Sequence, residues 1–176
     1  MKNVSRPECR RLPGNETTLR FLSPYLEQPH IRAGADDLLL APYGIWNLFI
    51  GIRLGRERVY GVFGWSEDNE RKTPDVFAGF VVGHLDESGT AFENHAFWNR
   101  GMSAADCAKL CIPVMKADFA KDGIRVSSVV GYIPDRNRAA KRYASQVGCL
   151  DRGLRTDKTF VKDGRVFPCR EFRLEL

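Results

Sequence analysis

The stretch 92–98 carries two side chains that can exchange protons, placed two residues apart. Apolar and polar residues alternate here as in a strand, so we expect Glu93, His95 and Phe97 on one face. A carboxylate beside an imidazole can accept and relay a proton near neutral pH. Glu93 and His95 are therefore candidates for a general base, although an ordinary polar pair at a strand edge has the same pattern. His84, on the preceding predicted strand, either completes this polar cluster or faces solvent.

The next segment has the features of a capped helix start. Ser103 lies three residues before Asp106, and a hydroxyl and a carboxylate at this spacing can satisfy free amide groups. The pattern predicts a helix over 104–120 with a kink at Pro113, because proline removes a backbone donor. Unpaired amides at a helix start, with the positive end of the helix dipole, attract phosphate. The segment therefore fits an anion site, and it fits equally a capped helix without a ligand.

A shorter, basic helix is expected between residues 135 and 148. Asp135 is expected to cap this helix and Gly148 to end it. Its positive charge comes from Arg136, Arg138, Lys141 and Arg142. These charges fit an anionic partner, either the phosphates of a nucleotide cofactor or a nucleic acid, and they also fit a solvated helix face. No recognised nucleic-acid motif accompanies them, so nucleic acid is the least favoured partner.

Residue types along the chain predict the elements that must position these groups. One or two short helices are expected between residues 15 and 40, where leucines recur at helical spacing. Runs rich in β-branched and aromatic residues predict strands at 45–53, 58–65, 76–85, 90–98 and 125–133. Turns are expected at 54–55 and 86–89, and a closing hairpin within 151–176 turns at 162–164.

Three residues of the basic helix have the spacing of a known family: Asn137 near its start, Ala140 three residues on, and Gly148 at its end. With the order of elements over about residues 45–176, they resemble the GNAT superfamily, the N-acyltransferases that use acyl-coenzyme A. The resemblance implies an α/β (α+β) fold, with a GNAT-like mixed, mostly antiparallel central sheet of about six to seven strands flanked by helices. Residues 1–176 are then expected to form a single GNAT-like domain.

The resemblance also implies a site. Family members bind acyl-coenzyme A in a V-shaped gap, here expected between the strand ending near Trp98 and the one ending near Ile133. Acetyl-CoA or another acyl-CoA would be the cosubstrate, and an amine of a small molecule or a protein the acceptor, with Glu93 or His95 as base. The residues expected to bind the cofactor are Phe97, Trp98, Arg100, Gly101, Met102, Ser103, Ala104 and Asn137.

The sequence departs from the family pattern at two places. Ser103 and Ala104 replace glycines of the family's pyrophosphate loop, which has the form Arg/Gln-x-x-Gly-x-Gly/Ala. Ala144 stands where many members carry a tyrosine that protonates the departing thiolate; Tyr143, one place earlier, is expected to point elsewhere and to pack. Tyr132 is another candidate proton donor, without a motif. These departures leave open an alternative, a catalytically degenerate GNAT-fold protein of phage or prophage type with a structural or interaction role.

Composition limits the class of protein. The chain has 176 residues and a net charge of +5, and no window approaches the roughly 20 apolar residues that cross a bilayer. The start does not resemble a secretory signal, so we expect a cytoplasmic protein without a membrane partner. Five cysteines without a C-x-x-C pair argue against a zinc ribbon, and we expect no metal. Cys107 and Cys111 are expected to be small core residues. A homodimer and association with a virion stay open.

Overall fold

The computed structural model describes residues 4–29, 31, 50–66, 76–99, 103–162 and 164–176. The elements follow one another as β1 (Val4–Leu12), α1 (Glu16–Leu26), β2 (Arg58–Ser66), β3 (Val76–Leu85), β4 (Ala91–Trp98), α5 (Ala104–Lys121), β5 (Ser128–Pro134), α6 (Arg138–Val147), β6 (Leu150–Lys162) and β7 (Arg165–Glu175). None of the helices in these ranges is long and apolar enough to cross a membrane.

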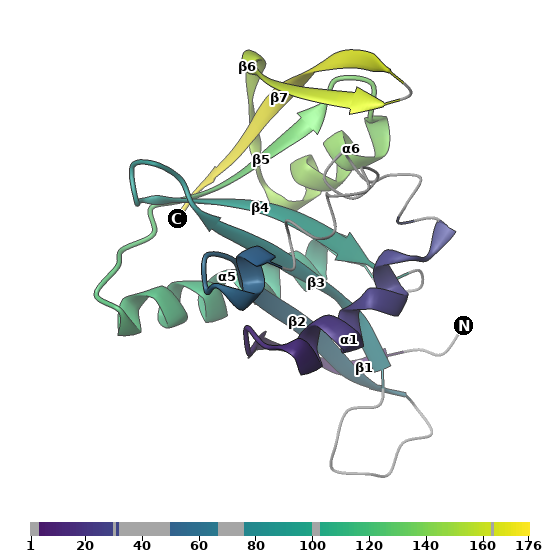
Figure 1. Cartoon of the computed structure of the whole chain (residues 1–176), viewed down its shortest axis with the longest axis vertical. Coiled ribbons are helices and arrows are strands. Elements are labelled where there is room, and N and C mark those ends of the chain that lie inside the picture. The colour runs from purple at the N-terminus through teal and green to yellow at the C-terminus, as the bar shows by residue number, and fades with distance from the viewer. Residues whose placement is uncertain (1–3, 30, 32–49, 67–75, 100–102, 163) are drawn as a thin grey trace.

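All seven strands form one sheet, in the order β1-β2-β3-β4-β5-β7-β6 (Figure 1). Neighbouring strands are antiparallel, except that β4 and β5 are parallel. The predicted mixed, mostly antiparallel sheet of about six to seven strands is therefore confirmed. α5 connects the two parallel strands, as the parallel arrangement requires, because a hairpin cannot join strands that run in the same direction.

Two apolar clusters cover the two faces of the first half of the sheet. One cluster joins α1 to residues such as Val59 and Val82, and the other joins α5 to their neighbours Tyr60 and Val81. Successive strand residues point to opposite faces, so this alternation separates the two layers. In Figure 1, α1 lies in front of the sheet and α5 crosses behind it. Cys107 and Cys111 are buried in the α5 layer, as the sequence predicted.

A buried carboxylate ties α5 to the first two strands. Asp118 accepts hydrogen bonds from Arg11 Nη1 at 2.8 Å, Arg58 Nη1 at 2.9 Å and the Tyr60 hydroxyl at 3.0 Å. Burial by itself would raise the pKa of Asp118, but these three donors outweigh burial and hold that pKa below its usual value. The Arg58 guanidinium also lies 3.8 Å above the ring of Phe119. Strand and helix are thus joined by charge as well as by apolar packing.

Four sequence predictions about local structure are wrong. Residues 50–53, the described part of the strand expected at 45–53, are helical, and Gly55 ends this turn with φ +70 instead of forming a hairpin. Ile52 is fully buried there, so tertiary packing overrides the β-type composition. The helix expected from Asp135 starts later: Asn137 is its N-cap. The strand expected from residue 125 begins at Ser128.

Candidate active site

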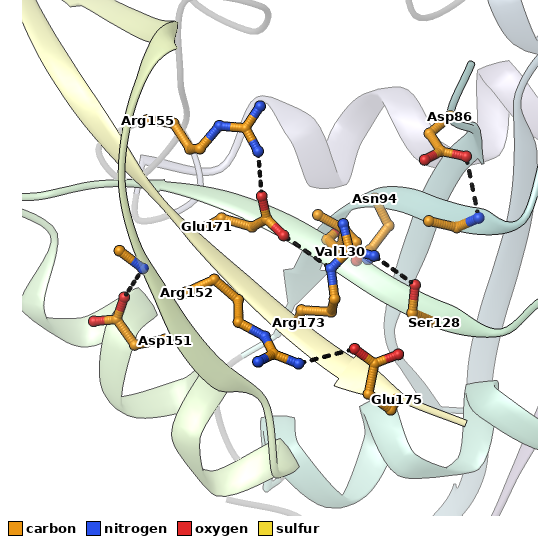
Figure 2. A network of polar contacts seen from close by, with 12 residues as sticks. Asp86, Asn94, Ser128, Val130, Asp151, Arg152, Arg155, Glu171, Arg173 and Glu175 are labelled. Atoms are coloured by element: carbon orange, nitrogen blue, oxygen red, sulfur yellow. Dashed lines mark hydrogen bonds and ion pairs between the residues drawn. The ribbon is translucent and has the colours of Figure 1, made fainter. Parts of the chain in front are cut away.

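The parallel strands β4 and β5 separate after a short paired segment. Their ladder contains only Ala91↔Ser128, Phe92↔Val129 and Glu93↔Val130. Beyond Glu93, β4 stays paired with β3 and β5 with β7, so the two halves of the sheet diverge. The side-chain amide of Asn94 donates to the carbonyl of Val130 at 3.0 Å and closes the apex of the gap (Figure 2). We call this gap the slot; it lies where the sequence predicted it.

A cavity of about 180 Å³ occupies the slot and reaches the helices behind it. Its walls come from β4, β5, α5 and α6, and include His95, Met115, Tyr132 and Asn137. Gly131, the first residue of β5 after the paired segment, faces open space: a Cβ built there meets no atom within 4 Å. The slot therefore has room for a narrow ligand beside the backbone of β5.

The predicted site residues fall into three groups. His95, Phe97 and Asn137 line the cavity. Glu93, Trp98, Ser103 and Ala104 do not belong to its lining; Ser103 instead caps α5, with its hydroxyl accepting from the amide of Asp106 at 3.3 Å. Arg100, Gly101 and Met102 lie outside the described residues. Phe97 also packs against Phe80 in the α1 layer, with ring centres 4.9 Å apart, so it has a structural role as well.

α6 forms one wall of the cavity. The Asn137 side chain accepts from the backbone amide of Ala140 at 3.0 Å, and Gly148 ends the helix with φ +105, so Asn137 and Gly148 cap the two ends of α6. Ala144 is buried and borders the cavity. Tyr143 borders it too, so the prediction that this tyrosine points elsewhere is wrong: the cavity spans enough of α6 to touch both positions.

Tyr143 is a protonated phenol throughout the neutral range. Burial raises its pKa, and the nearby indole N–H of Trp98 only partly opposes that rise. The Trp98 N–H itself completes no well-formed hydrogen bond within the described part of the chain. Burial likewise raises the pKa of Tyr132, on the β5 side of the slot, and the charge of Glu93 adds to the effect. Two neutral phenols therefore border the cavity from opposite sides.

A charged cluster lies at the apex of the slot, and the sequence did not indicate all of it. Glu93 is only 17% exposed and forms an ion pair with Lys158 of β6 at 3.3 Å. The ammonium group of Lys158 also lies 4.6 Å from the centre of the Tyr132 ring. No motif surrounds Lys158, and only the fold brings it to β4. Glu93 is thus the partner of a lysine, while His95 lines the cavity itself.

Further charged groups extend this cluster along the open face of β7 (Figure 2). Glu171, whose side chain is 7% exposed, accepts from Arg155 Nη1 at 2.5 Å and from Arg173 Nε at 2.8 Å. Arg173 in turn donates to the hydroxyl of Ser128 at 3.1 Å. The chain of contacts crosses β6, β7 and β5, so charge, not an apolar layer, joins these strands on this face.

His84 completes the cluster on the β3 side. It is the cross-strand neighbour of Glu93, and its Nδ1 lies 3.0 Å from the carboxylate of Glu57. The hydrogen bond to Glu57 raises the pKa of His84; burial opposes this, and the charges of Glu57 and Glu93 support it. Of the two options that the sequence left open, the structure therefore favours a member of the polar cluster.

Comparisons with known proteins support the fold. No protein-family model matches the sequence, and no curated protein is significantly similar to it. Solved structures with the same fold include the microcin self-immunity acetyltransferase MccE in complex with acetyl-CoA and AMP, with 11% identity, TM-score 0.65, and coverage of 96% of this chain and 93% of that one. Spermidine N-acetyltransferase from Vibrio cholerae, in complex with CoA and spermine, has 13% identity, TM-score 0.65, and coverage of 97% and 96%.

A third structure has the same arrangement. It is the ribosomal-protein alpha-N-acetyltransferase RimL in complex with coenzyme A, with 10% identity, TM-score 0.65, and coverage of 99% of this chain and 97% of that one. The chain therefore has the GNAT acetyltransferase fold over almost its full length. Identities this low establish the shared architecture and leave the activity to be argued from the site.

Proposed function

We propose that this protein is an acyl-coenzyme A dependent N-acyltransferase that transfers an acyl group, with acetyl as the first candidate, to an amine. The observation that carries the proposal is the slot: two parallel strands that part after three residue pairs and enclose a cavity between them. The solved structures with this fold that hold acetyl-CoA or CoA support the same choice of cosubstrate.

The walls of the slot suit the narrow pantetheine arm of coenzyme A. Beyond Asn94, the β5-facing edge of β4 has no strand partner among the described residues, which leaves backbone groups to pair with the amides of that arm. Gly131 provides space on the opposite side, and Asn137 borders the cavity from α6. The start of α5, with Ser103 and Ala104 and the preceding residues 100–102, would receive the pyrophosphate.

An acyl-coenzyme A supplies an activated acyl group as a thioester, and this chain must move two protons around it. Glu93 and His95 are the candidates for the base that accepts a proton from the amine. Tyr143 is the candidate for the acid at the departing thiolate, because burial keeps its phenol protonated. Tyr132 is the second candidate acid, from the opposite wall.

The test is titration calorimetry of the full chain with acetyl-CoA, followed by release of free thiol in the presence of a panel of amines. We expect saturable binding and thiol release that depends on an amine. Glu93→Gln and His95→Gln would show which of the two candidates is the base. The variant that lacks the true base should lose the fall in rate at acidic pH that protonation of this base causes. Absence of binding heat and of any thermal shift at millimolar acetyl-CoA would refute the proposal.

A second candidate function is a GNAT-fold structural or interaction protein without catalysis, of the kind found with phages. Ala144 in place of the usual tyrosine, and Ser103 and Ala104 in place of glycines, favour it. This candidate predicts that the protein co-purifies with a virion or partner protein and carries no bound cofactor. Turnover of any amine would exclude it.

A further inference from the structure

Lys158 occupies a site that the chain builds for an ammonium group. Its Nζ lies 3.3 and 3.4 Å from the two carboxylate oxygens of Glu93 and 4.6 Å from the centre of the Tyr132 ring. A carboxylate and the face of an aromatic ring are the two kinds of group that stabilise an ammonium ion most strongly. The Lys158 side chain is still 40% exposed, so water and small molecules can reach the amine.

An irregularity of β6 places Lys158 there. Pairing with β7 passes from Arg155↔Cys169 directly to Thr159↔Pro168, so residues 156–158 bulge out of the ladder. Arg155 fixes the bulge: its Nε and Nη2 donate to the Asp157 carboxylate at 2.8 and 2.7 Å, and its Nη1 donates to Glu171. Bulges of this kind re-aim side chains beside active sites.

The held amine lies at the apex of the slot. Glu93 is the last residue of β4 that pairs with β5, and Tyr132 belongs to the separated part of β5 and lines the cavity. The amine of Lys158, 4.6 Å from the ring of Tyr132, is thus held beside a residue of the cavity wall, where an acyl-coenzyme A bound in the slot would find an amine of the chain itself. Resting on the proposed function, we infer that Lys158 is an internal acyl acceptor, which this protein acylates itself.

The reaction balances without any further reagent. The Lys158 ammonium first gives a proton to Glu93, which passes it to solvent. The free amine then attacks the thioester carbonyl, an amide C–N bond forms and the C–S bond breaks. The second proton of the nitrogen goes to the departing thiolate, so coenzyme A leaves as the free thiol.

Acylation changes the site as well as the lysine. The amide of acylated Lys158 is neutral and cannot form an ion pair with Glu93. The carboxylate and the Tyr132 ring then become available to the ammonium group of an external amine. Self-acylation would thus convert a closed acceptor site into an open one.

The experiment is incubation of the full chain with acetyl-CoA, followed by peptide mapping with mass spectrometry. We expect one acetyl group on Lys158, gained faster than on Lys141, a matched lysine that is 30% exposed and ion-paired with Asp135 at 3.2 Å. Glu93→Gln should slow modification of Lys158 about 100-fold, the usual contribution of a general base. Lys158→Arg should remove the modification, and Lys141→Arg should leave that of Lys158 unchanged.

A second readout needs no coenzyme. A trace of N-hydroxysuccinimide acetate should label Lys158 slowly in the native chain, because the contacts with Glu93 and with the Tyr132 ring hold the amine in place, and faster in the Glu93→Gln variant. Lys141 serves as the internal standard, whose labelling should be equal in both chains. Equal labelling of Lys158 in both chains would show that Glu93 does not hold the amine, and would overturn the inference.

The outcomes separate this inference from the proposed function. If acetyl-CoA binds, but Lys158 gains acetyl no faster than Lys141 or than the same lysine in the unfolded chain, self-acylation is refuted and acyl transfer to other amines stands. If acetyl-CoA does not bind at all, both proposals fail.

Discussion

The two halves of the sheet are stabilised in different ways. In β1–β4 both faces carry an apolar layer, one under α1 and one under α5, with side chains such as Phe80 and Val82 almost completely buried. In β5–β7 one face borders the cavity and the other carries the chain of contacts from Arg155 through Glu171 to Ser128. The first half is a close-packed frame, and the second half leaves space and charge for a ligand.

This difference is consistent with a site at the border of the two halves. Strands that belong to one continuous apolar core resist separation, because parting them exposes apolar surface. β4 is paired along its length with β3, and β5 with β7, whereas β4 and β5 share only three residue pairs. The pairing between β4 and β5 is therefore the place where the sheet separates most easily. The slot is therefore located where the two modes of stabilisation meet.

The largest expected effect tests the frame. Phe80→Ala should lower the free energy of unfolding by about 3–5 kcal/mol, because Phe80 is 1% exposed and its loss leaves a cavity in the α1 layer. The matched change in the other half, Phe167→Ala, should cost about 1 kcal/mol, mainly the contact of its ring with the Arg136 guanidinium at 3.8 Å. Urea unfolding of both variants measures the difference. Equal losses would contradict the contrast between the halves.

The second prediction compares one buried carboxylate from each half. Asp118→Asn should lower the free energy of unfolding by about 2–3 kcal/mol, because the guanidinium groups of Arg11 and Arg58 lose their charged partner. Solvent screens these two ion pairs only in part. Glu171→Gln should cost less, because neither Arg155 nor Arg173 is shielded from solvent as well as Arg58, the partner of Asp118 whose side chain is 13% exposed. Thermal unfolding at neutral pH gives both values. A larger loss for Glu171→Gln would reverse the comparison.

Asp118 also predicts a dependence on pH. Its pKa is lower in the folded than in the unfolded chain, where the usual value is 3.8, so its contribution is complete above that value. The contribution is lost as pH falls through the folded pKa, when the carboxylate takes up a proton. Unfolding measured from neutral to strongly acidic pH should show a shallower acid limb in Asp118→Asn than in the native chain. An identical limb in the two chains would show that another group causes the acid loss.

The third prediction concerns the border between the halves. Gly131→Val should weaken acetyl-CoA binding at least tenfold, about 1.4 kcal/mol, because the new side chain fills the open space of the slot. Its effect on folding should be small, since valine is well suited to a strand and a Cβ at this position meets no atom within 4 Å. Gly131→Ala is the graded control, with a smaller loss of binding. Unchanged calorimetric affinity in the valine variant would place the ligand elsewhere.

The smallest effect separates capping from binding at α6. Asn137→Ala should cost about 1 kcal/mol of stability through loss of the cap on Ala140, whereas Asn137→Asp should keep the cap. If Asn137 also contacts the cofactor, both variants lose affinity for acetyl-CoA although only one loses stability. Full affinity in Asn137→Asp would leave Asn137 with the capping role alone.

Local sequence signals predicted most of the elements. β3 has the predicted bounds, and β2, β4 and α5 differ from theirs by one residue, because alternation, turn residues and a serine cap act within a few positions. The helical turn at residues 50–53 was missed, because its apolar residues suit a strand equally well and only burial under α1 decides between the two. Tyr143 was misplaced, because a helical angle does not indicate how widely a cavity wraps around the helix.

The sequence by itself determined the order of elements from β2 to β7, the serine cap of α5 and the glycine that ends α6, because each depends on residues close together in the chain. The resemblance to the GNAT superfamily added the slot between the strands ending near Trp98 and Ile133. Only the tertiary structure decided that Lys158 meets Glu93, 65 residues away, over the ring of Tyr132. That contact depends on a bulge and on the spacing of three strands. No local pattern records such a distance, because it is set by how β4, β5 and β6 pack against their neighbours.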